Sequence, residues 1–400
     1  MSNHQAPEQM LGYIYQIRYA LYLLLQNDDP DAIISIEKFD DIALTTEDDN
    51  LNTYIQLKHH TKNHGSLTDS STDVWRTLNA WINEIKKDIS ILNNTKFLII
   101  TTAKSPVDSA CSLLSDDMNS RNTEKAFEKL LYICNNSDNK AHEFFYENFK
   151  VQSDTITKKL VENIYIIDNA YNIVESANEI KKRLRYGCKE QHISSVFERL
   201  EGWWYNKSIE ALNSVDPVFI NAKQVTSYIV DLNQQYRDDN LPIDIYEDDL
   251  DFENAKFITQ MFYEQLKLIG VSSRKLTIAL QDYYKAFRQR ANWVRNDLLY
   301  LNELDSYERR LIDEWEHCFI DMLDNIDMNN ISDDIDVKKL GRQLLNQIES
   351  KDIRVRERCS EPFIMRGSYH MLADQFKIGW HADFKNRLKY LLKEEDSRDE

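Results

Sequence analysis

The sequence predicts an α/β N-terminal domain followed by a mainly α-helical C-terminal domain, and three observations support this. The run Lys96–Thr102 is almost continuously apolar and β-branched, which is typical of a strand buried on both faces. A helical pattern separates this run from two earlier strand-like runs, so the connection is a helical crossover. From about Ala170 onward apolar residues recur at helical spacing, and the whole chain has only 8 Gly and 6 Pro.

The N-terminal elements follow from local patterns. Apolar residues at three- and four-residue steps predict a first helix over Glu8–Gln26, which ends at the turn formers of Asn27–Pro30. Two strand-like runs occupy Ile33–Lys58, and the polar loop Thr45–Thr53 separates them. A second amphipathic helix begins at about Ser71. These elements and the later buried strand give an α/β core with helices on both sides.

The rest of the chain is predicted to be helical with one further strand at Asn163–Asp168. The acidic segment 238–253 is interpreted as a solvated surface loop. We predict a domain of residues 1–210 and a second of residues 211–400. The amphipathic stretches of the helical region are 120–148, 174–184, 193–209, 254–268, 276–301 and 307–323.

Composition limits the kinds of partner and compartment. The chain has 49 basic and 67 acidic residues and a formal net charge of -18, which argues against indiscriminate binding to phosphate backbones. Any nucleic-acid contact must come from a local basic patch or from a partner. The five cysteines are widely spaced without a CxxC pair, which indicates a reduced, cytoplasmic protein and argues against structural zinc. The apolar run Tyr19–Leu25 is too short to span a bilayer, so no membrane association is expected.

Acidic residues and a lysine meet in the stretch Ile33–Lys58. Gln56 and Lys58 lie two residues apart on one strand and therefore share a face, and pairing of the two runs would bring Asp41 to that face. Glu37 has the same parity as Asp41 along its run. A carboxylate, an amide oxygen, the Leu57 carbonyl and an ammonium at one end of a hairpin can hold a divalent cation beside a scissile phosphate. The alternative is a set of exposed hairpin charges without a site.

Five short motifs follow one another in the first part of the chain: Gly12-Tyr13-x-Tyr15-Gln16, Glu37-x-x-Asp40-Asp41-Ile42, Gln56-Leu57-Lys58-His59, Leu67-Thr68-Asp69-Ser70 and Asp73-x-Trp75-x-Thr77-Leu78-x-x-Trp81. In order and spacing they resemble the Cap-type PD-(D/E)xK double-stranded DNA endonuclease domain of bacterial anti-phage systems. The resemblance implies a restriction-endonuclease-like fold for residues 1–210 and Mg²⁺ or Mn²⁺ as the cofactor.

That resemblance also assigns roles to residues. It implies that Asp41, Gln56 and Lys58 form the active site. The strand pattern adds Glu37 to the catalytic set, and it gives Asp41, Gln56 and the carbonyl of Leu57 as the metal ligands. Gln56 stands where many relatives of the wider superfamily carry Glu, and Gln16 stands where some carry a helix Glu. These two departures leave open whether one or two metals are bound.

Basic residues beside this stretch are candidates for DNA contact. His59, His60 and Lys62 follow the proposed site directly, so we predict that they bind DNA. A second basic run, Lys181–Arg185, is interpreted as a solvated helix face.

The far end of the chain resembles the C-terminal module of ABC-three-component proteins, among them the nuclease subunit of Lamassu anti-phage systems. The motifs are Glu361-Pro362-Phe363, Arg366-Gly367-Ser368-Tyr369-His370-x-Leu372-Ala373-Asp374 and Gly379-Trp380-His381-x-Asp383-Phe384. The resemblance implies an SMC-like or Rad50-like ATPase and a small accessory subunit as partners, with Trp380, His381 and Arg366 at the docking surface. A metal site made of His370, Asp374 and His381 is the alternative interpretation.

Together the motifs favour a Mg²⁺-dependent double-stranded DNA endonuclease, the effector subunit of an anti-phage or anti-plasmid complex. The resemblance implies that the helical half holds it inactive on the ATPase, and that release or homo-oligomerisation activates it. The alternative is a catalytically degenerate adaptor or scaffold subunit of the same type of complex.

Overall fold

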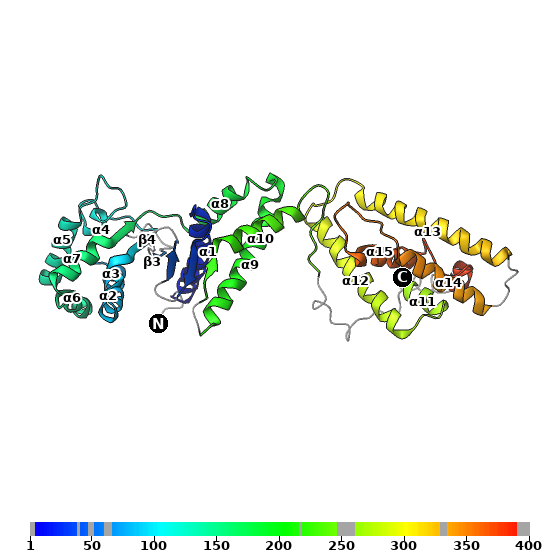
Figure 1. The fold of residues 1–400 in the computed structure, drawn as a ribbon, viewed down its shortest axis with the longest axis horizontal. Helices are drawn as coiled ribbons and strands as arrows, with labels where there is room; N and C mark the ends of the chain where they lie inside the picture. Colours follow the sequence, from blue (N-terminus) through cyan, green and yellow to red (C-terminus); the bar gives the residue numbers. More distant parts are fainter. Residues whose placement is uncertain are drawn as a thin grey trace. The chain divides into compact units, whose positions relative to one another are not determined.

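The computed structural model describes residues 5–37, 41–46, 52–59, 66–215, 218–245, 261–328 and 334–389 (Figure 1). The chain divides into two compact units, residues 1–233 and residues 234–400. The boundary lies later than the predicted one after residue 210, because the short strand β6 (Ile220–Asn221) pairs with β1 (Ile33–Ile36) and most of α10 (Ala222–Gln235) follows within the first unit.

A six-stranded mixed sheet forms the centre of the first unit, in the order β5-β4-β3-β2-β1-β6. β3 (Asn52–Lys58), β4 (Thr95–Thr101) and β5 (Ile164–Ile167) are parallel to one another, whereas β1, β2 (Ile42–Thr45) and β3 form an antiparallel meander. The predicted strands at residues 96–102 and 163–168 are confirmed as β4 and β5. The two-residue strand β6 is too short to leave a pattern in the sequence.

The first strand-like run is a hairpin rather than one strand. Ile36 pairs with Ile42, and the N–H of Glu37 donates to the carbonyl of Asp41 at 3.0 Å between the two strands. Glu37 has a φ of 55°, in the left-handed region that strands do not use. The prediction of a single strand through Glu37 and Asp41 was therefore wrong. The apolar residues stay buried in β1 and β2, and the acidic residues lie where the chain reverses.

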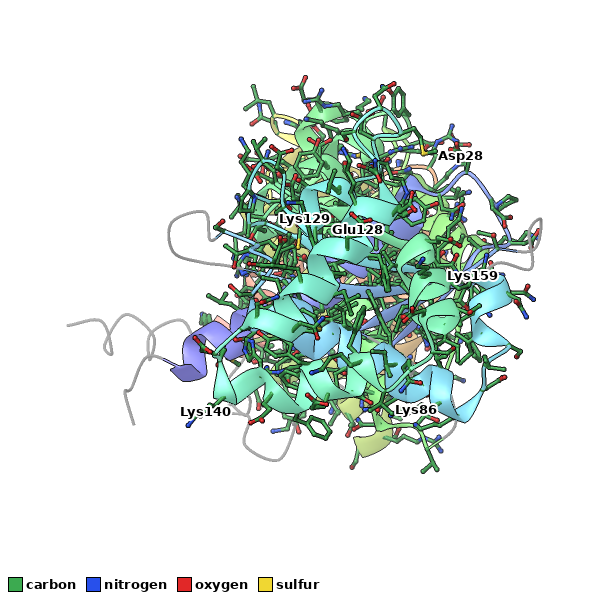
Figure 2. All side chains as sticks on the ribbon, turned by 90° about the vertical axis from the view of Figure 1, so that its left-hand side faces the viewer. Asp28, Lys86, Glu128, Lys129, Lys140 and Lys159 are labelled. Atoms are coloured by element: carbon green, nitrogen blue, oxygen red, sulfur yellow. The ribbon has the colours of Figure 1, made fainter. Side chains whose placement is uncertain are left out.

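One face of the sheet is covered by α2 (Thr72–Lys87), α5 (Thr123–Asn136), α6 (Glu143–Lys150) and α7 (Asp154–Asn163), with the short helices α3 (Ile91–Asn94) and α4 (Ala110–Leu113) (Figure 1). Ser71 precedes α2, as predicted. Trp81 of α2 packs against Phe97 of β4 with 5.0 Å between ring centroids. Figure 2 shows this layer from outside, where charged side chains such as Lys86, Glu128 and Lys140 lie on the helices.

The opposite face is covered by α1 (Gln5–Gln26), α8 (Ile173–Leu184) and α9 (Ile193–Asn213), which Figure 1 shows on the other side of β3 from α2. The predicted first helix is confirmed as α1. The indole of Trp204 on α9 donates to the carbonyl of Ile17 at 2.7 Å, and the hydroxyl of Tyr15 donates to the carbonyl of Tyr171 at 2.9 Å. These bonds fix α1 against the helices that follow the sheet.

The described residues of the second unit are mostly helical. The unit contains α11 (Met261–Leu268), α12 (Ser273–Arg295), α13 (Glu303–Met328), α14 (Asp334–Glu349) and α15 (Pro362–Asp374). The predicted helices are confirmed where residues are described, although positions 254–260 of the first lie outside the described residues and the one expected over 276–301 ends at Arg295. α15 approaches α12 closely because Gly367 has no side chain, and a Cβ there would lie 2.1 Å from the carbonyl oxygen of Asp282.

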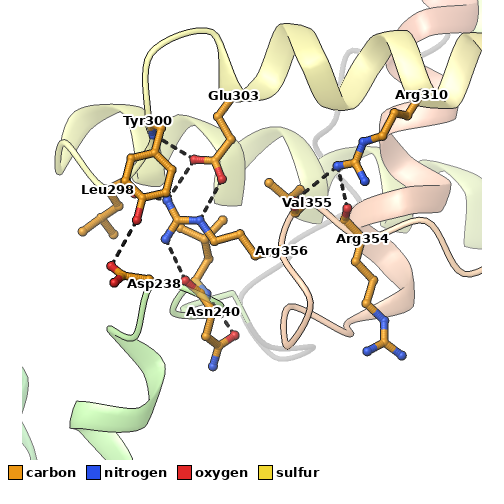
Figure 3. A network of polar contacts seen from close by, with 10 residues as sticks. Asp238, Asn240, Leu298, Tyr300, Glu303, Arg310, Arg354, Val355 and Arg356 are labelled. Carbon is orange, nitrogen blue, oxygen red and sulfur yellow. Dashed lines mark hydrogen bonds and ion pairs between the residues drawn. The ribbon is translucent and has the colours of Figure 1, made fainter.

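A buried guanidinium ties three segments of this unit together (Figure 3). Arg356 makes a bidentate ion pair with Glu303, with nitrogen-oxygen distances of 2.7 and 2.8 Å. It also donates to the carbonyls of Asn240 and Leu298 at 2.9 and 2.7 Å, and it lies over the ring of Tyr300. Bidentate geometry of this kind is specific to arginine.

Within the described residues, no helix combines the length and the apolar character needed to cross a membrane. All five cysteines are free thiols.

Candidate active site

The carboxylate of Asp41 is the centre of the polar cluster beside β3. The backbone N–H of Leu57 donates to its Oδ2 at 2.7 Å, and the side-chain amides of Gln56 and Gln16 also donate to it. Burial raises the pKa of Asp41, and the charge of Lys58 and these hydrogen bonds oppose the rise. Because β2 and β3 are paired antiparallel, Asp41 lies just before Ile42 and opposite Gln56. The local register therefore explains why these side chains meet.

Glu37 and Lys58 complete the cluster. Burial raises the pKa of Glu37, the neighbouring Asp41 carboxylate raises it further, and Lys58 opposes the rise. The structure thus brings together the predicted residues Glu37, Asp41, Gln56 and Lys58. Glu37 reaches the cluster through the turn between β1 and β2, not through the strand parity that the sequence predicted.

Gln56 and Lys58 share one face of β3 because they alternate with the buried residues Ile55 and Leu57. The register with β4 pairs Gln56 with Ile99 and Lys58 with Thr101. Lys58 is the last residue of β3, so its ammonium lies at the carboxyl end of the parallel strands. In open α/β sheets this edge is where ligands bind.

The oxygen donors of this cluster fit a hard divalent cation. Asp41 and Glu37 supply carboxylates, and Gln56 uses its NH₂ group toward Asp41, which leaves its carbonyl oxygen for another partner. The Leu57 carbonyl points to the same side as its N–H, toward Asp41, because both groups of a strand residue face the same neighbouring strand. Such a donor set suits Mg²⁺ or Mn²⁺, which keep several water ligands.

The cluster has fewer acidic ligands than many metal sites. Among the described residues, no group of three or more His, Cys, Asp or Glu side chains is arranged to hold a metal ion. A cation at Asp41 would therefore depend on two carboxylates, neutral oxygens and water.

The residues predicted to contact DNA are only partly described. The ring of His59 packs against Tyr15 with 4.6 Å between centroids, so its side chain is half-buried. His60 and Lys62 lie outside the described residues. In the second basic run, Lys182 pairs with Glu179 and Lys181 lies over the ring of Phe197. These contacts occur at the C-terminal end of α8, where positive charge stabilises a helix.

Two of the residues expected at a docking surface lie in the core of the second unit. Trp380 is 0% exposed and His381 is 2% exposed, so neither side chain can contact a partner directly in this conformation. The ring of Trp380 packs against Tyr369 and His370 instead. Arg366 is half-buried beside a pocket of about 330 Å³. Burial raises the pKa of the nearby Asp282 to about 6, and the charge of Arg366 opposes that rise.

The alternative metal site at the C-terminal end does not assemble. His370 is fully buried, and burial lowers its pKa to about 3. The carboxylate of Asp374 accepts hydrogen bonds from the Phe262 N–H and the Tyr283 hydroxyl, at 3.1 and 3.4 Å. His381 lies 3.6 Å from Asp334. These side chains therefore serve separate packing contacts, and they belong to none of the metal-ligand groups in the described chain.

Comparison with known protein families gives a match in the second unit. Residues 262–388 match the model of C-terminal domain 7 of the ABC-three component (ABC-3C) systems. The match begins in α11 and covers the second-unit motifs, so the predicted ABC-three-component module is confirmed. No curated protein matches the chain.

Solved structures similar to the chain include the Acinetobacter baumannii Cap4 SAVED/CARF-domain containing receptor. With the cyclic trinucleotide 2'3'3'-cAAA this receptor shares 14% identity at a TM-score of 0.33, covering 56% of this chain and 45% of that one. Without a named ligand it shares 17% identity at a TM-score of 0.31, covering 58% and 50%. The chain thus spans about half the length of these structures, and TM-scores this low describe a weak likeness.

Proposed function

We propose that the chain is a metal-dependent double-stranded DNA endonuclease, the effector subunit of a bacterial defence complex of the ABC-three-component type. The observation that supports this most directly is the convergence of Asp41, Gln56 and Lys58 at the carboxyl end of β3. An acidic residue, a neutral oxygen donor and an ammonium at one point are the groups that metal-assisted phosphodiester hydrolysis needs. The motif resemblance of residues 12–81 to PD-(D/E)xK endonucleases gives the same assignment.

Each side chain has a defined task in this proposal. Asp41, held by the Leu57 N–H and by Gln56, would bind the cation together with Glu37 and the Leu57 carbonyl. When bound, Mg²⁺ would polarise the phosphate and lower the pKa of a coordinated water. Lys58 would stabilise negative charge that develops on the phosphate oxygens.

The second unit supports a place in a larger complex. Its match to an ABC-three-component C-terminal domain favours docking on an ABC ATPase partner, which we propose to be SMC-like or Rad50-like, with a small accessory subunit. A chain with a net charge of -18 binds DNA weakly on its own, which would keep a resting nuclease off host DNA. Release from the ATPase or homo-oligomerisation would then bring nuclease units together on duplex DNA. The alternative is an adaptor whose site is degenerate.

Conservative substitutions at the site test the proposal. Purified chain, alone and with its partners, is incubated with linear and circular duplex DNA and Mg²⁺ or Mn²⁺. Asp41→Asn keeps an acceptor for the Leu57 N–H but loses the charge, and Lys58→Met keeps the aliphatic stem. We expect each to lower the cleavage rate by about 100-fold or more, in the range of a lost transition-state contact.

Lys96→Met is the matched control. Lys96 is an exposed lysine on β4, which pairs in parallel with the strand that carries Lys58, but it lies at the opposite end of the sheet. Cleavage should be unchanged in this variant and should stop when the metal is chelated. Cleavage that survives both Asp41→Asn and Lys58→Met, or a complete absence of cleavage in every assembled state, would favour the adaptor.

A further inference from the structure

A second polar site lies on the sheet face that carries Lys58. A pocket of about 310 Å³ opens where β4 and β5 end, and its walls include Ser105, Cys111, Leu113, Ile166 and Asp168. This volume is within the range of pockets that enclose small organic ligands. Its position at the carboxyl ends of parallel strands is the usual location of ligand sites in open α/β sheets.

The sheet register places this pocket close to the candidate active site. Lys58 pairs with Thr101, and Ile99 pairs with Ile166. Asp168 follows Ile166 by two residues, so Lys58, Thr101 and Asp168 belong to one row across three neighbouring strands and point to one face. Two strand spacings separate the ends of the row, which puts the Lys58 and Asp168 backbones about 10 Å apart. That distance is comparable to the size of one nucleotide.

The pocket offers a carboxylate that accepts hydrogen bonds and a hydroxyl that can donate one. Ser105 is only 5% exposed, and its hydroxyl oxygen is buried without a hydrogen-bond partner. Buried hydroxyls of this kind are uncommon, because leaving one unpaired is costly. The Ser105 N–H donates to Oδ2 of Asp168 at 2.6 Å, which fixes the carboxylate at the wall, and a carboxylate has lone pairs for further donors.

The residues that line the pocket limit the chemical class of the ligand. The described residues that line the pocket include the two acids Asp108 and Asp168 and no basic residue, so a phosphate is disfavoured inside it. Cys111, Leu113 and Ile166 supply apolar walls, and burial raises the pKa of the Cys111 thiol, which therefore stays neutral. The pocket thus suits an uncharged ligand that carries N–H donors and apolar surface.

We propose that this pocket binds a nucleobase with an exocyclic amino group, which donates to the carboxylate of Asp168 while the Ser105 hydroxyl pairs with a ring nitrogen. The base has two possible sources. It belongs either to a nucleotide of the DNA strand held at Lys58, in which case the inference rests on the proposed nuclease function, or to a free nucleoside. The chemistry of recognition is the same in both cases.

Matched nucleosides test the recognition directly. Binding of adenosine and inosine, and of cytidine and uridine, is measured by calorimetry on the full chain. Each pair differs by the exchange of an amino group for a carbonyl oxygen, which would oppose the Asp168 carboxylate, and the adjacent ring nitrogen changes from an acceptor to an N–H donor. We expect the amino member to bind about tenfold more tightly, as for one lost hydrogen bond to a charged group. Equal binding within both pairs, or no binding at millimolar concentration, overturns the proposal.

Substitutions test whether Asp168 and Ser105 cause the preference for amino nucleosides. Asp168→Asn keeps an acceptor for the Ser105 N–H but should erase the preference for amino nucleosides, and Ser105→Ala should weaken all of them by a similar factor without breaking a hydrogen bond of the protein. Asp116→Asn, an exposed acid outside the pocket, is the matched control and should change nothing. A preference that survives Asp168→Asn places recognition elsewhere and overturns the assignment.

Cleavage distinguishes the two sources. Duplexes in which adenine is replaced by hypoxanthine next to the cut site are compared in the wild type and in Asp168→Asn. A cleavage preference that Asp168→Asn removes identifies the DNA base as the ligand, whereas nucleoside discrimination without a cleavage preference identifies a free nucleoside. Because nucleoside binding should persist in Asp41→Asn, an absence of nuclease activity would refute the proposed function without affecting the binding result.

Discussion

The two units use similar residues in opposite ways. In the first unit Glu37, Asp41 and Lys58 gather at the end of the sheet and remain partly accessible. In the second unit the histidines and the tryptophan of the conspicuous C-terminal motif are almost completely enclosed, with Trp380 at 0% exposure and His370 at 1%. A dense polar and aromatic motif therefore does not by itself indicate a surface.

The cause of this difference is the architecture around each motif. A sheet edge leaves the ends of strands open, so polar side chains there can contact one another and solvent. A bundle of helices buries whatever faces its axis, and small residues in the motif allow close approach. Gly379 lies directly against the ring of Phe384, since a Cβ at this glycine would come within 2.2 Å of that ring, and its carbonyl accepts a hydrogen bond from the Trp315 indole at 2.9 Å. The C-terminal motif is therefore a packing motif.

The largest effect is expected where the second unit depends on a buried charge. Arg356→Lys loses the bidentate pair with Glu303 and the contacts to two carbonyls. We expect a loss of about 3 kcal/mol, since a lysine ammonium cannot reproduce the two parallel bonds to Glu303 and would leave the two carbonyls without their donor. Hydrogen exchange of peptides from α12 and α13 measures this loss of stability. Arg309→Lys, an exposed arginine of α13, is the control and should change little.

The next largest change in stability is expected from replacing a tightly packed glycine of the second unit, compared with an open glycine of the first. Gly367→Ala would place a methyl group 2.1 Å from the carbonyl oxygen of Asp282, so α15 and α12 must separate, at a cost of about 2 kcal/mol. Gly202→Ala on α9 meets no atom within 4 Å and should stabilise the first unit by about 0.5 kcal/mol. Denaturant unfolding measures the change in the free energy of unfolding for each variant. Equal effects of the two substitutions would contradict the difference in packing.

Much of the fold was predictable from the sequence because hydrophobic periodicity determines it. The continuous apolar run of β4 and the helical spacing of α1 and α2 each specify one structure. The β1–β2 hairpin was missed because Ile33–Thr45 reads as one strand when only composition is considered. The reversal depends on the positive φ of Glu37, and a glutamate gives no local signal for it.

The candidate site was predictable in part. The spacing of Gln56 and Lys58 follows from strand alternation, and the pairing of β2 with β3 brings Asp41 to them. Asp168 and Ser105 were missed because their proximity to Lys58 depends on the register of three parallel strands from distant parts of the sequence. Burial of Trp380 was missed because local sequence does not distinguish an exposed aromatic anchor from a core residue.

A buried histidine gives an effect in the second unit that is small at neutral pH and grows as the pH falls. Burial lowers the pKa of His370 from 6.5 to about 3, so the unfolded chain binds a proton between these pH values and the folded chain does not. Stability therefore falls as pH drops from 6.5 toward 3, by about 1.4 kcal/mol per pH unit at most for this group. His370→Phe should flatten that slope and be nearly neutral at pH 7.

Urea unfolding between pH 4 and pH 7 measures how stability changes with pH in the wild type and in His370→Phe. The difference between wild type and His370→Phe isolates this residue, because other titrating groups cancel. His317→Phe on α13 is a control for the substitution itself. An unchanged slope in His370→Phe would mean that the imidazole is solvated in solution, and the core of the second unit would then be more open than the structure indicates.

The smallest effect is a change in protonation at the sheet edge, and it tests the geometry of the first unit without requiring activity. The charge of Lys58 opposes the rise that burial causes in the pKa of Asp41 and Glu37. Lys58→Met removes that opposition, so both carboxyl groups should titrate at higher pH than in the wild type.

Carbon NMR of labelled carboxyl groups follows the titration, and Asp41→Asn assigns the signal. Lys96→Met, at the far end of β4, should leave it unchanged. A titration that Lys58→Met does not move would mean that the ammonium does not face Asp41, and the first unit would then lack the accessible polar cluster that distinguishes it from the second.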